Sequence, residues 1–414
     1  MSTILSKYLK RYAEDLARSE LNLCGLPQYS HAVVVPCYAE PDISRLLKSL
    51  DVAARPLAQK VLMIIVINQR THSNASVGEA NRLLWESLKN RGILSTLYRE
   101  PEVCLVDTTD AFDILMVDRF HTPFADNEGV GSARKLGSDL ALRLIESGAI
   151  ANHFIVTTDG DAELSANYFD FKIEPRNLIN PIHPPKTPPG AFLSQFTHAL
   201  TPDPFTNQAI TRYDQHLRRY QEGLENAGSP FAYVAMGSAM SFSPTLLAQV
   251  RGIPKRMAGE DFHFLNKAAK IAPIYHRPQS TVTLHWRHDQ VPPHERLPFG
   301  TACSVDKLLR GESASFHYPE VCFDALKQLL RATYESLLLA DTGSFNPSLP
   351  VWAQEYLKEQ NFLGNLSTVV TERKTYEDRL RQFHTGWDAL KTLKFIHAGR
   401  EYLTHHEEEV AQTP

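Results

Sequence analysis

Two carboxylates stand one residue apart in the stretch FIVTTDGDAELSANYF, residues 154–169. The apolar run 154–156 predicts a buried strand, so Asp159 and Asp161 would lie just past its carboxyl end. Ligands of open α/β sheets bind at such ends, and close carboxylates repel each other unless a cation joins them. The spacing therefore indicates a Mg²⁺ or Mn²⁺ site that also receives a substrate phosphate, with Gly160 allowing close approach. The alternative is a solvated turn in which Asp159 caps the following helix.

A second acidic pair occurs in GEDFHFL, residues 259–265. Gly259 can precede a helix, which puts Glu260 and Asp261 in the first turn, where the helix dipole favours a charged carboxylate. An ionised aspartate in that position can act as a general base toward a hydroxyl. The alternative is that both residues only mark a helix start.

Two cations open another predicted helix in EGVGSARKLGSDLAL, residues 128–142. Arg134 and Lys135, together with the helix N-terminus, would form a phosphate site, and a solvated basic face is the alternative. Gly129 and Gly131 resemble only half of a dinucleotide fingerprint. Because no strand runs directly into them, we do not expect a Rossmann site.

A histidine in TLHWRHD, residues 283–289, is a candidate for a third metal ligand. His285 follows the β-like run 281–284, and a neutral imidazole nitrogen is a common metal ligand. His288 is the competing candidate. Arg287 and Arg296 could meet a diphosphate or an anionic acceptor, although surface arginines are the commoner case.

These residues need a scaffold that brings strand ends together. The first three hundred residues alternate short apolar runs with helical patterns, which predicts the α/β class, with a mostly parallel central sheet and helices on both faces. The expected strands cover 31–36, 61–67, 103–106, 154–158 and 191–196, and the expected helices cover 41–50, 75–88 and 132–145. A proline-rich loop spans 174–206, Thr206 can cap a helix to about residue 226, another helix begins near 259, and the chain after 315 is nearly all helical.

Bulk composition excludes several classes of protein. The 414 residues, 43% apolar and 22% charged, are typical of a globular protein, and a net charge of −4 argues against a nucleic-acid binder. We see no membrane span and no secretory signal, and five scattered cysteines without a CxxC pair favour a reducing cytoplasm. The apolar face of residues 4–16 predicts a helix packed on the domain, with a membrane-surface helix as the alternative.

Taken in chain order, five motifs over residues 31–300 resemble the family-2-like glycosyltransferases of the GT-A fold. They are VVVPCYAE (33–40), VLMIIVIN (61–68), GSARKLGSDLA (131–141), TTDGD (157–161) and GED (259–261). The resemblance implies a metal-dependent enzyme that moves a sugar from a UDP- or GDP-sugar to an acceptor hydroxyl, with Mn²⁺ or Mg²⁺ as cofactor. It also implies an N-terminal helical segment (1–30), a GT-A catalytic domain (31–305) and a helical C-terminal region (306–414).

The site residues of that family carry over position by position. Pro36, Tyr38 and Glu40 would line the nucleotide pocket, and Asn68 would lie beside the base or ribose. Arg134 and Lys135 would lie near the ribose or diphosphate, Asp159 would touch the ribose or a metal-bound water, and Asp161 would bind the metal. Asp261 would be the catalytic base, helped by Glu260, and His285 would be a further metal ligand.

The chain departs from the family pattern, which leaves alternatives open. Ala39 stands where the family often has Asn, and NQRTHSN (68–74) replaces the DDGSxD segment, so an aspartate that commonly holds the base is missing. The QxxRW motif and membrane helices of processive synthases are absent, which implies a soluble, non-processive enzyme. An inverting single displacement is expected, although GED with a late histidine also occurs in retaining enzymes.

Two other functions compete with a glycosyltransferase. A nucleotidyltransferase would show a Gly-rich loop where PCYAEPD (36–42) stands, and a non-catalytic nucleotide-sugar-binding protein is the second rival. Within the glycosyltransferase interpretation, the C-terminal helices would cover the acceptor side, and the loop 174–206 is a candidate lid over the donor.

Overall fold

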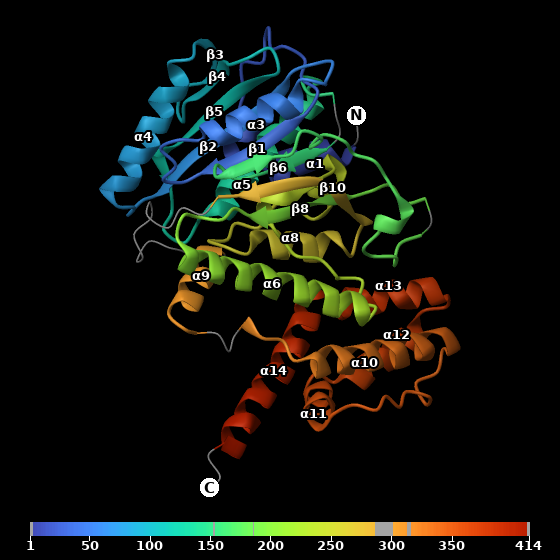
Figure 1. Cartoon of the computed structure of the whole chain (residues 1–414). Coiled ribbons are helices and arrows are strands. Elements are labelled where there is room, and N and C mark those ends of the chain that lie inside the picture. The colour runs from blue at the N-terminus through green and yellow to red at the C-terminus, as the bar shows by residue number, and fades with distance from the viewer. Residues whose placement is uncertain (1–2, 152–153, 185, 286–300, 313–315, 412–414) are drawn as a thin grey trace.

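Four parallel strands form the centre of the sheet in the computed structural model, which describes residues 3–151, 154–184, 186–285, 301–312 and 316–411. In spatial order they are β5 (Phe112–Phe124), β2 (Val61–Arg70), β1 (Ala32–Cys37) and β6 (Ile155–Thr157) (Figure 1). All of β1 and most of β2 are buried. Helices cover both faces of these strands, which explains their continuous apolar sequences.

Antiparallel pairs flank this centre, so the ten-stranded sheet is mixed. One margin holds β4 (Val103–Asp107) and β3 (Ile93–Tyr98). The other holds β9 (Met240–Phe242), β8 (Ala191–His198), β10 (Ile274–Leu284) and β7 (Ala162–Leu164), among which only β8 and β10 run parallel to each other. The predicted α/β class is confirmed, and parallel pairing describes the centre rather than the margins.

The long strand β5 is absent from the sequence-based prediction because charged residues interrupt its apolar pattern. Asp113 is fully buried within it. Its carboxylate accepts hydrogen bonds from Lys60 Nζ (2.9 Å) and from the Tyr29 hydroxyl (2.9 Å). A buried carboxylate is tolerated when it is paired in this way.

Side chains alternate along β1 and thereby supply two cores. Ala32 and Val34 face a core shared with α5 (Val130–Glu146), α1 (Thr3–Arg11), α7 (Pro244–Gln249) and α8 (Glu260–Ala268). Val33 and Val35 face a core shared with α3 (Ser44–Ala54) and α4 (Ala75–Lys89). A Cβ on Gly137 of α5 would lie 2.4 Å from Val34 Cγ1, so this glycine lets α5 lie directly on the sheet.

The helix α6 (Pro204–Asn226) lies between the sheet and the C-terminal helices (Figure 1). Its N-cap is Asp203, whose carboxylate accepts the backbone N–H groups of Phe205 and Thr206. The expectation that Thr206 caps the helix is therefore wrong, because Asp203 followed by Pro204 is a stronger helix start. The helix α9 (Thr301–Leu309) packs along α6.

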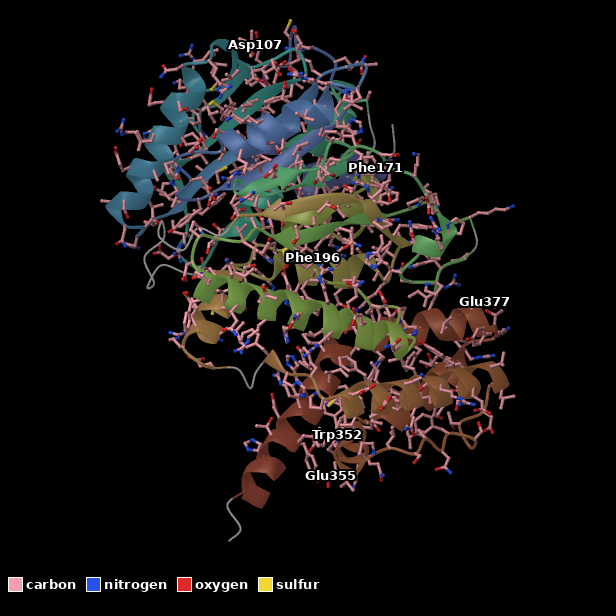
Figure 2. All side chains as sticks on the ribbon, viewed as in Figure 1. Asp107, Phe171, Phe196, Trp352, Glu355 and Glu377 are labelled. Atoms are coloured by element: carbon pink, nitrogen blue, oxygen red, sulfur yellow. The ribbon has the colours of Figure 1, made fainter. Side chains whose placement is uncertain are left out.

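The predicted helical C-terminal region is present as five helices among the described residues. They are α10 (Glu320–Leu339), α11 (Val351–Glu359), α12 (Phe362–Glu372), α13 (Tyr376–Gly386) and α14 (Ala389–Ala411). They bury a separate core, which includes Trp352 (Figure 2) and is completed by Leu224 near the end of α6. The division of the chain at residues 30 and 305 stays a prediction.

The N-terminal helices pack on the sheet domain. Tyr8 and Leu9 of α1 and Leu16 of α2 (Asp15–Arg18) are buried in the core that includes α5 and α7. This packing favours the packed-helix interpretation over a membrane-surface helix. No helix within the described ranges combines the length and the apolar character needed to cross a bilayer.

The proline-rich loop before β8 is anchored at the amino ends of the parallel strands. Asn180 is fully buried, and its Nδ2 donates to the carbonyls of Ala269 (2.9 Å) and Ala272 (3.1 Å). Its Oδ1 accepts the N–H of Ile274 at the start of β10 (2.7 Å). The carboxyl ends lie at the opposite edge, so the expectation of a lid over a donor bound there is wrong for this part of the loop.

Candidate active site

The strand order reverses between β1 and β6. The chain runs outward from β1 to β2 and on to the edge strand β3, returns through β4 to β5, and then places β6 on the other side of β1. In open α/β sheets, ligands bind outside the carboxyl ends at such a switch point. The N–H of Thr158 donates to the Val34 carbonyl (3.0 Å), whereas Pro36, two residues further along β1, has no N–H with which to extend the ladder. The two strands therefore part at this point.

The segments that follow β1 and β6 meet beyond these strand ends. A Cβ on Gly160 would lie 3.0 Å from Glu40 Cδ and 3.3 Å from Cys37 Sγ. Glu40 is buried, so its carboxyl group packs directly on the turn between Asp159 and Asp161. A side chain at position 160 would press on the Glu40 carboxyl group, so glycine suits the close approach of the two segments. The structure thus brings part of the predicted nucleotide pocket beside the paired aspartates.

Arg134 of α5 is the central cation of the site. Its side chain is 2% exposed, and Nη2 donates to Asp159 Oδ1 (2.8 Å), Nε to Glu260 Oε1 (3.0 Å) and Nη1 to the Gly237 carbonyl (3.0 Å). Burial alone would lower the pKa of the guanidinium, but the two carboxylates raise it above its ordinary value. The predicted phosphate-binding arginine therefore connects the two acidic motifs.

Gly237 joins the same cluster through its backbone. Its carbonyl accepts from Arg134 and from the Thr157 hydroxyl (2.6 Å), and its N–H donates to Asp261 Oδ2 (2.9 Å). A Cβ at this position would lie 2.7 Å from Arg134 Nη2. Any larger residue would displace the guanidinium and with it the carboxylates of Asp159 and Glu260.

The acidic pair of α8 begins directly after Gly259, which adopts the left-handed conformation (φ 72°). Glu260 is buried and points at Arg134, whereas Asp261 is partly buried and accepts from the backbone N–H of Gly237 and Phe262. Burial, and next the negative charge of Glu260, raise the pKa of Asp261 to about 7. A carboxyl group with that pKa can accept a proton near neutral pH.

The connection between β6 and β7 brings the far margin of the sheet to this cluster. Only residues 158–161 join the two strands, although β9, β8 and β10 stand between them in the sheet order. Four strand spacings amount to about 19 Å, more than five extended residue steps of about 3.5 Å can span. The connection is also turned, since Ala162 N–H donates to the Asp159 carbonyl (3.1 Å). The sheet must therefore coil at this margin.

Asp161 and His285 lie side by side as a result of that coiling. The His285 N–H donates to the Asp161 carbonyl (3.1 Å), in line with the pairing of β7 and β10. His285 Nε2 lies 3.1 Å from Glu163 Oε2, so Nδ1 is the ring nitrogen through which this imidazole could bind a metal. Across the described ranges, no three His, Cys, Asp or Glu side chains gather closely enough to hold a metal by themselves.

A carboxylate and an imidazole are a suitable donor set for Mn²⁺ when a substrate supplies the remaining ligands. Divalent cations at phosphate sites commonly take one or two protein ligands together with phosphate oxygens and waters. A ligating histidine usually has a carboxylate on its second ring nitrogen, and Glu163 holds that position at His285. The residues present therefore fit a metal that binds together with a diphosphate.

The predicted nucleotide pocket is held together by two buried asparagines. Asn68 Nδ2 donates to the Cys37 carbonyl (2.8 Å), and Asn81 Nδ2 donates to the Asn68 carbonyl (3.0 Å). Asn81 Oδ1 accepts the Ala39 N–H (3.1 Å). The amide nitrogen of Asn68 is thus engaged with the backbone, and the residue fixes the ends of β1 and β2 relative to each other.

Tyr38 lies at the more open side of the predicted pocket. Its hydroxyl is 3.3 Å from Ser73 Oγ, and the Arg70 guanidinium lies over its ring at 5.9 Å. Pro36, by contrast, is buried within β1 and paired with Val66. Pro36 therefore shapes the strand end, and its place in the nucleotide pocket stays a prediction.

Lys135 lies on another side of α5 from Arg134 and outside the cluster. Its Nζ donates to Asp139 Oδ2 (2.7 Å), to the Tyr12 carbonyl (2.8 Å) and to the Tyr8 hydroxyl (3.1 Å). The expectation that Lys135 approaches a ribose or diphosphate is thus not met in this structure, because the ammonium is committed to the N-terminal helices. His288, Arg287 and Arg296 lie outside the described residues.

Sequence reasoning missed Gly237, Asn81 and Glu163. Gly237 acts through its backbone, and its signal in the sequence is only the run of small residues in AMGSAM, 235–240. Asn81 is an ordinary polar residue in a helical pattern. Glu163 lies two residues after Asp161, and its pairing with His285 depends on the antiparallel contact of β7 with β10.

Comparisons with known proteins add the following. No protein-family model and no curated protein matches the chain. Among solved structures it is similar to S. aureus TarS in complex with UDP-GlcNAc, at 12% identity and a TM-score of 0.35 over 86% of this chain and 91% of that chain. It is similar to the mannosyltransferase PcManGT from Pyrobaculum calidifontis in complex with GDP-Man and Mn²⁺, at 14% identity and a TM-score of 0.32 over 92% and 93%.

A third match is GalNAc-T7 with UDP, GalNAc and Mn²⁺, at 12% identity and a TM-score of 0.34 over 83% of this chain and 58% of that chain. Identities and TM-scores this low assign no activity to this chain, so its function has to be argued from its own residues.

Proposed function

We propose that the chain is a metal-dependent glycosyltransferase that moves a sugar from a UDP- or GDP-sugar to an acceptor hydroxyl. The observation that supports this most is the buried guanidinium of Arg134, which binds Asp159 of TTDGD and Glu260 of GED. One cation thereby fixes a diphosphate-binding motif relative to a proton-accepting motif. Both lie at the switch point of the sheet, where a nucleotide would bind.

Asp261 is the proposed base. The acceptor hydroxyl oxygen attacks the anomeric carbon, its proton passes to the Asp261 carboxylate, and the nucleoside diphosphate leaves with the electron pair of the broken C–O bond. The burial and the Glu260 charge that raise the pKa of Asp261 to about 7 make it an effective base near neutral pH. Glu260 acts on Asp261 through its charge and is itself held by Arg134.

Asp161 and His285 would hold the Mn²⁺ or Mg²⁺, and Glu163 would orient the imidazole. The metal would neutralise negative charge on the departing diphosphate. Asp159 is held by Arg134 and is placed to contact the ribose or a metal-bound water rather than to serve as the main ligand. Tyr38 and Glu40 would contact the nucleoside, with Asn68 and Asn81 supporting the segment that carries them.

The cysteines bear on where the reaction takes place. The five cysteines of the chain are scattered along the sequence without a CxxC pair, and Cys37, Cys104 and Cys322 are buried. We propose the cytoplasm, where thiols stay reduced.

Calorimetry tests the donor site directly. UDP, GDP, CDP and dTDP are titrated with and without Mn²⁺ into wild type, Asp161→Ala and the surface control Asp110→Ala. We expect Mn²⁺-dependent binding of one nucleotide that Asp161→Ala weakens at least about tenfold and Asp110→Ala leaves unchanged. Absence of binding for all four nucleotides in wild type overturns the proposal.

A further inference from the structure

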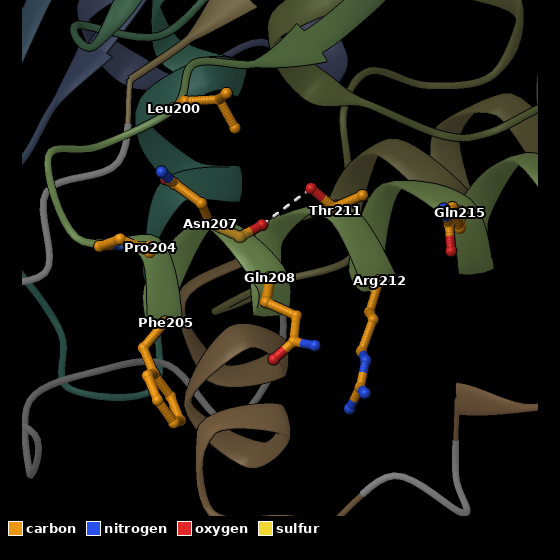
Figure 3. Close-up of a pocket in the computed structure, with 8 residues that line it drawn as sticks. All are labelled: Leu200, Pro204, Phe205, Asn207, Gln208, Thr211, Arg212 and Gln215. Atoms are coloured by element: carbon orange, nitrogen blue, oxygen red, sulfur yellow. Dashed lines mark hydrogen bonds between the residues drawn. The ribbon is translucent and has the colours of Figure 1, made fainter.

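A pocket of about 630 Å³ lies along the first half of α6, next to the segment that enters the helix from β8. Figure 3 shows Phe205, Gln208 and Arg212 projecting from one side of α6, with Leu200, Asn207 and Thr211 placed above the helix axis. Phe205 is 76% exposed and Leu200 is 70% exposed. These two exposed apolar side chains therefore border the hollow, where a ligand could cover them.

The chemistry of the lining residues selects the class of ligand. The exposed ring of Phe205 offers a flat apolar face, and the amides of Gln208 and Gln215 offer paired donors and acceptors. A saccharide presents the matching groups, since one face of a pyranose ring is lined by C–H bonds and its rim carries vicinal hydroxyls. Arg212 is the charged member of the eight lining residues, none of which is acidic, so neutral and anionic sugars both fit.

Backbone bonds place this pocket beside the proposed metal ligands. Ala199 N–H donates to the Leu284 carbonyl (2.8 Å), and the next residue on that strand, His285, is bonded to Asp161 (3.1 Å). Leu200 follows Ala199 directly, and neighbouring strands lie about 5 Å apart. Leu200, which forms one wall of the pocket, therefore lies about two strand spacings from Asp161, where the diphosphate would be held.

The helix that carries the pocket is fixed from behind. Ile210 and Tyr213 of α6 pack with Val305 and Leu308 of α9 in a buried cluster. The N-terminus of α6 is held by Asp203, and Asn207 Nδ2 donates to the Thr201 carbonyl (2.8 Å). The exposed face is thus presented by a rigid element, as a specific binding site requires.

We propose that this face of α6 binds the acceptor, and that the acceptor is a saccharide. The inference rests on the proposed function, because an acceptor site is meaningful only beside a donor site. Phe205 would stack on one sugar ring, and Gln208 and Arg212 would hold hydroxyls or a carboxylate of the same chain. The reacting hydroxyl would then lie beyond Leu200, toward Asp161.

Saturation-transfer NMR on the full chain tests the saccharide site without a donor. The probes are maltotriose, chitotriose and an unsaturated hyaluronan disaccharide, each with wild type, Phe205→Ala, Thr211→Trp and the control Leu338→Ala. Phe205→Ala removes the stacking ring, and Thr211→Trp fills the pocket from an exposed helix position. Leu338 is a similarly exposed apolar residue on α10 (63%).

We expect at least one probe to bind wild type and the control, and to lose affinity about tenfold or more in both pocket variants. Nucleotide binding by calorimetry should be the same in all four proteins. Absence of signal from all three sugars in wild type, or unchanged sugar binding in both variants, overturns the inference. The molecular mass of each protein is also measured at several protein concentrations. If the pocket variants change how the mass depends on concentration, this face of α6 binds a protein, and the saccharide inference is wrong. If wild type binds no nucleotide in calorimetry, the proposed function is refuted, whatever the result with the sugars.

Discussion

Replacing Asp261 by Asn separates the chemical role of this carboxylate from its effect on stability. Its pKa in the folded protein is about 7, against an ordinary value of 3.8. Between these two values the folded chain keeps a proton that the unfolded chain has lost, so stability falls as the pH rises from about 4 to about 7 and then levels off. The raised pKa corresponds to a loss on the order of 4 kcal/mol over that window.

The Asn variant lacks this pH dependence but has a cost of its own. Asp261 accepts two backbone N–H groups, from Gly237 (2.9 Å) and Phe262 (2.7 Å). An amide oxygen can replace one carboxylate oxygen, whereas the amide nitrogen faces a donor, so the variant loses about 1 to 3 kcal/mol at every pH. This constant cost cancels when the stability difference between variant and wild type is compared at two pH values.

Urea unfolding at about pH 4.5 and about pH 8 measures the effect. Relative to wild type, Asp261→Asn should gain about 3 kcal/mol between the lower and the higher pH, because pH 4.5 already lies above the ordinary pKa, whereas the exposed control Asp110→Asn should show no such change. Turnover at saturating substrate should fall by about 10²–10⁴. A variant that follows wild type at both pH values, or that keeps full turnover, refutes the reasoning about this carboxylate.

Three further substitutions test the supporting contacts. Arg134→Met leaves two carboxylates without their cation and should lower the free energy of unfolding by about 3 to 5 kcal/mol, whereas the exposed Arg82→Met should leave it nearly unchanged. Equal effects of the two substitutions in urea unfolding would contradict the pairing. Tyr8→Phe removes the hydroxyl that donates to Asp139 (2.6 Å) and should lower the free energy of unfolding by about 1 to 3 kcal/mol in the same assay without changing nucleotide affinity. A lower nucleotide affinity in this variant would link the N-terminal helices to the site. Glu163→Gln should weaken Mn²⁺ binding in the presence of nucleotide by about 10- to 100-fold, and unchanged calorimetric affinity would remove Glu163 from the metal site.

Much of the fold followed from the sequence, because the buried central strands are continuous apolar runs. β1, β2 and β6 and the helices that cover them were predicted from periodicity alone. β5 was not predicted, because Asp113 breaks its apolar pattern. The residue that allows Asp113 to be buried, Lys60, belongs to the segment before β2. The antiparallel pairing at the margins was not predicted, because the pairing of β6 with β9, or of β10 with β7, depends on the path of the whole chain.

The site was predictable where residue type decides the chemistry and not where orientation does. Asp159, Glu260 and Asp261 were singled out as acids near a strand end or a helix start, and they lie in one cluster around Arg134. Lys135 was grouped with Arg134 because they are neighbours in sequence. Adjacent helical residues point about 100° apart, and a sequence does not show which of the two directions faces the site.

The short connection between β6 and β7 also sets limits on how this chain can vary in length. In a flat sheet, a segment as short as residues 158–161 could not reach from β6 to β7 even when fully extended. Deleting one residue there would pull the coiled margin apart, and inserting one would let Asp161 drift from His285 while Asp159 stayed bound to Arg134. Length changes should therefore be tolerated in the proline-rich loop at the other edge of the sheet and be nearly forbidden here, so that the distance between the two aspartates is set by the architecture as a whole.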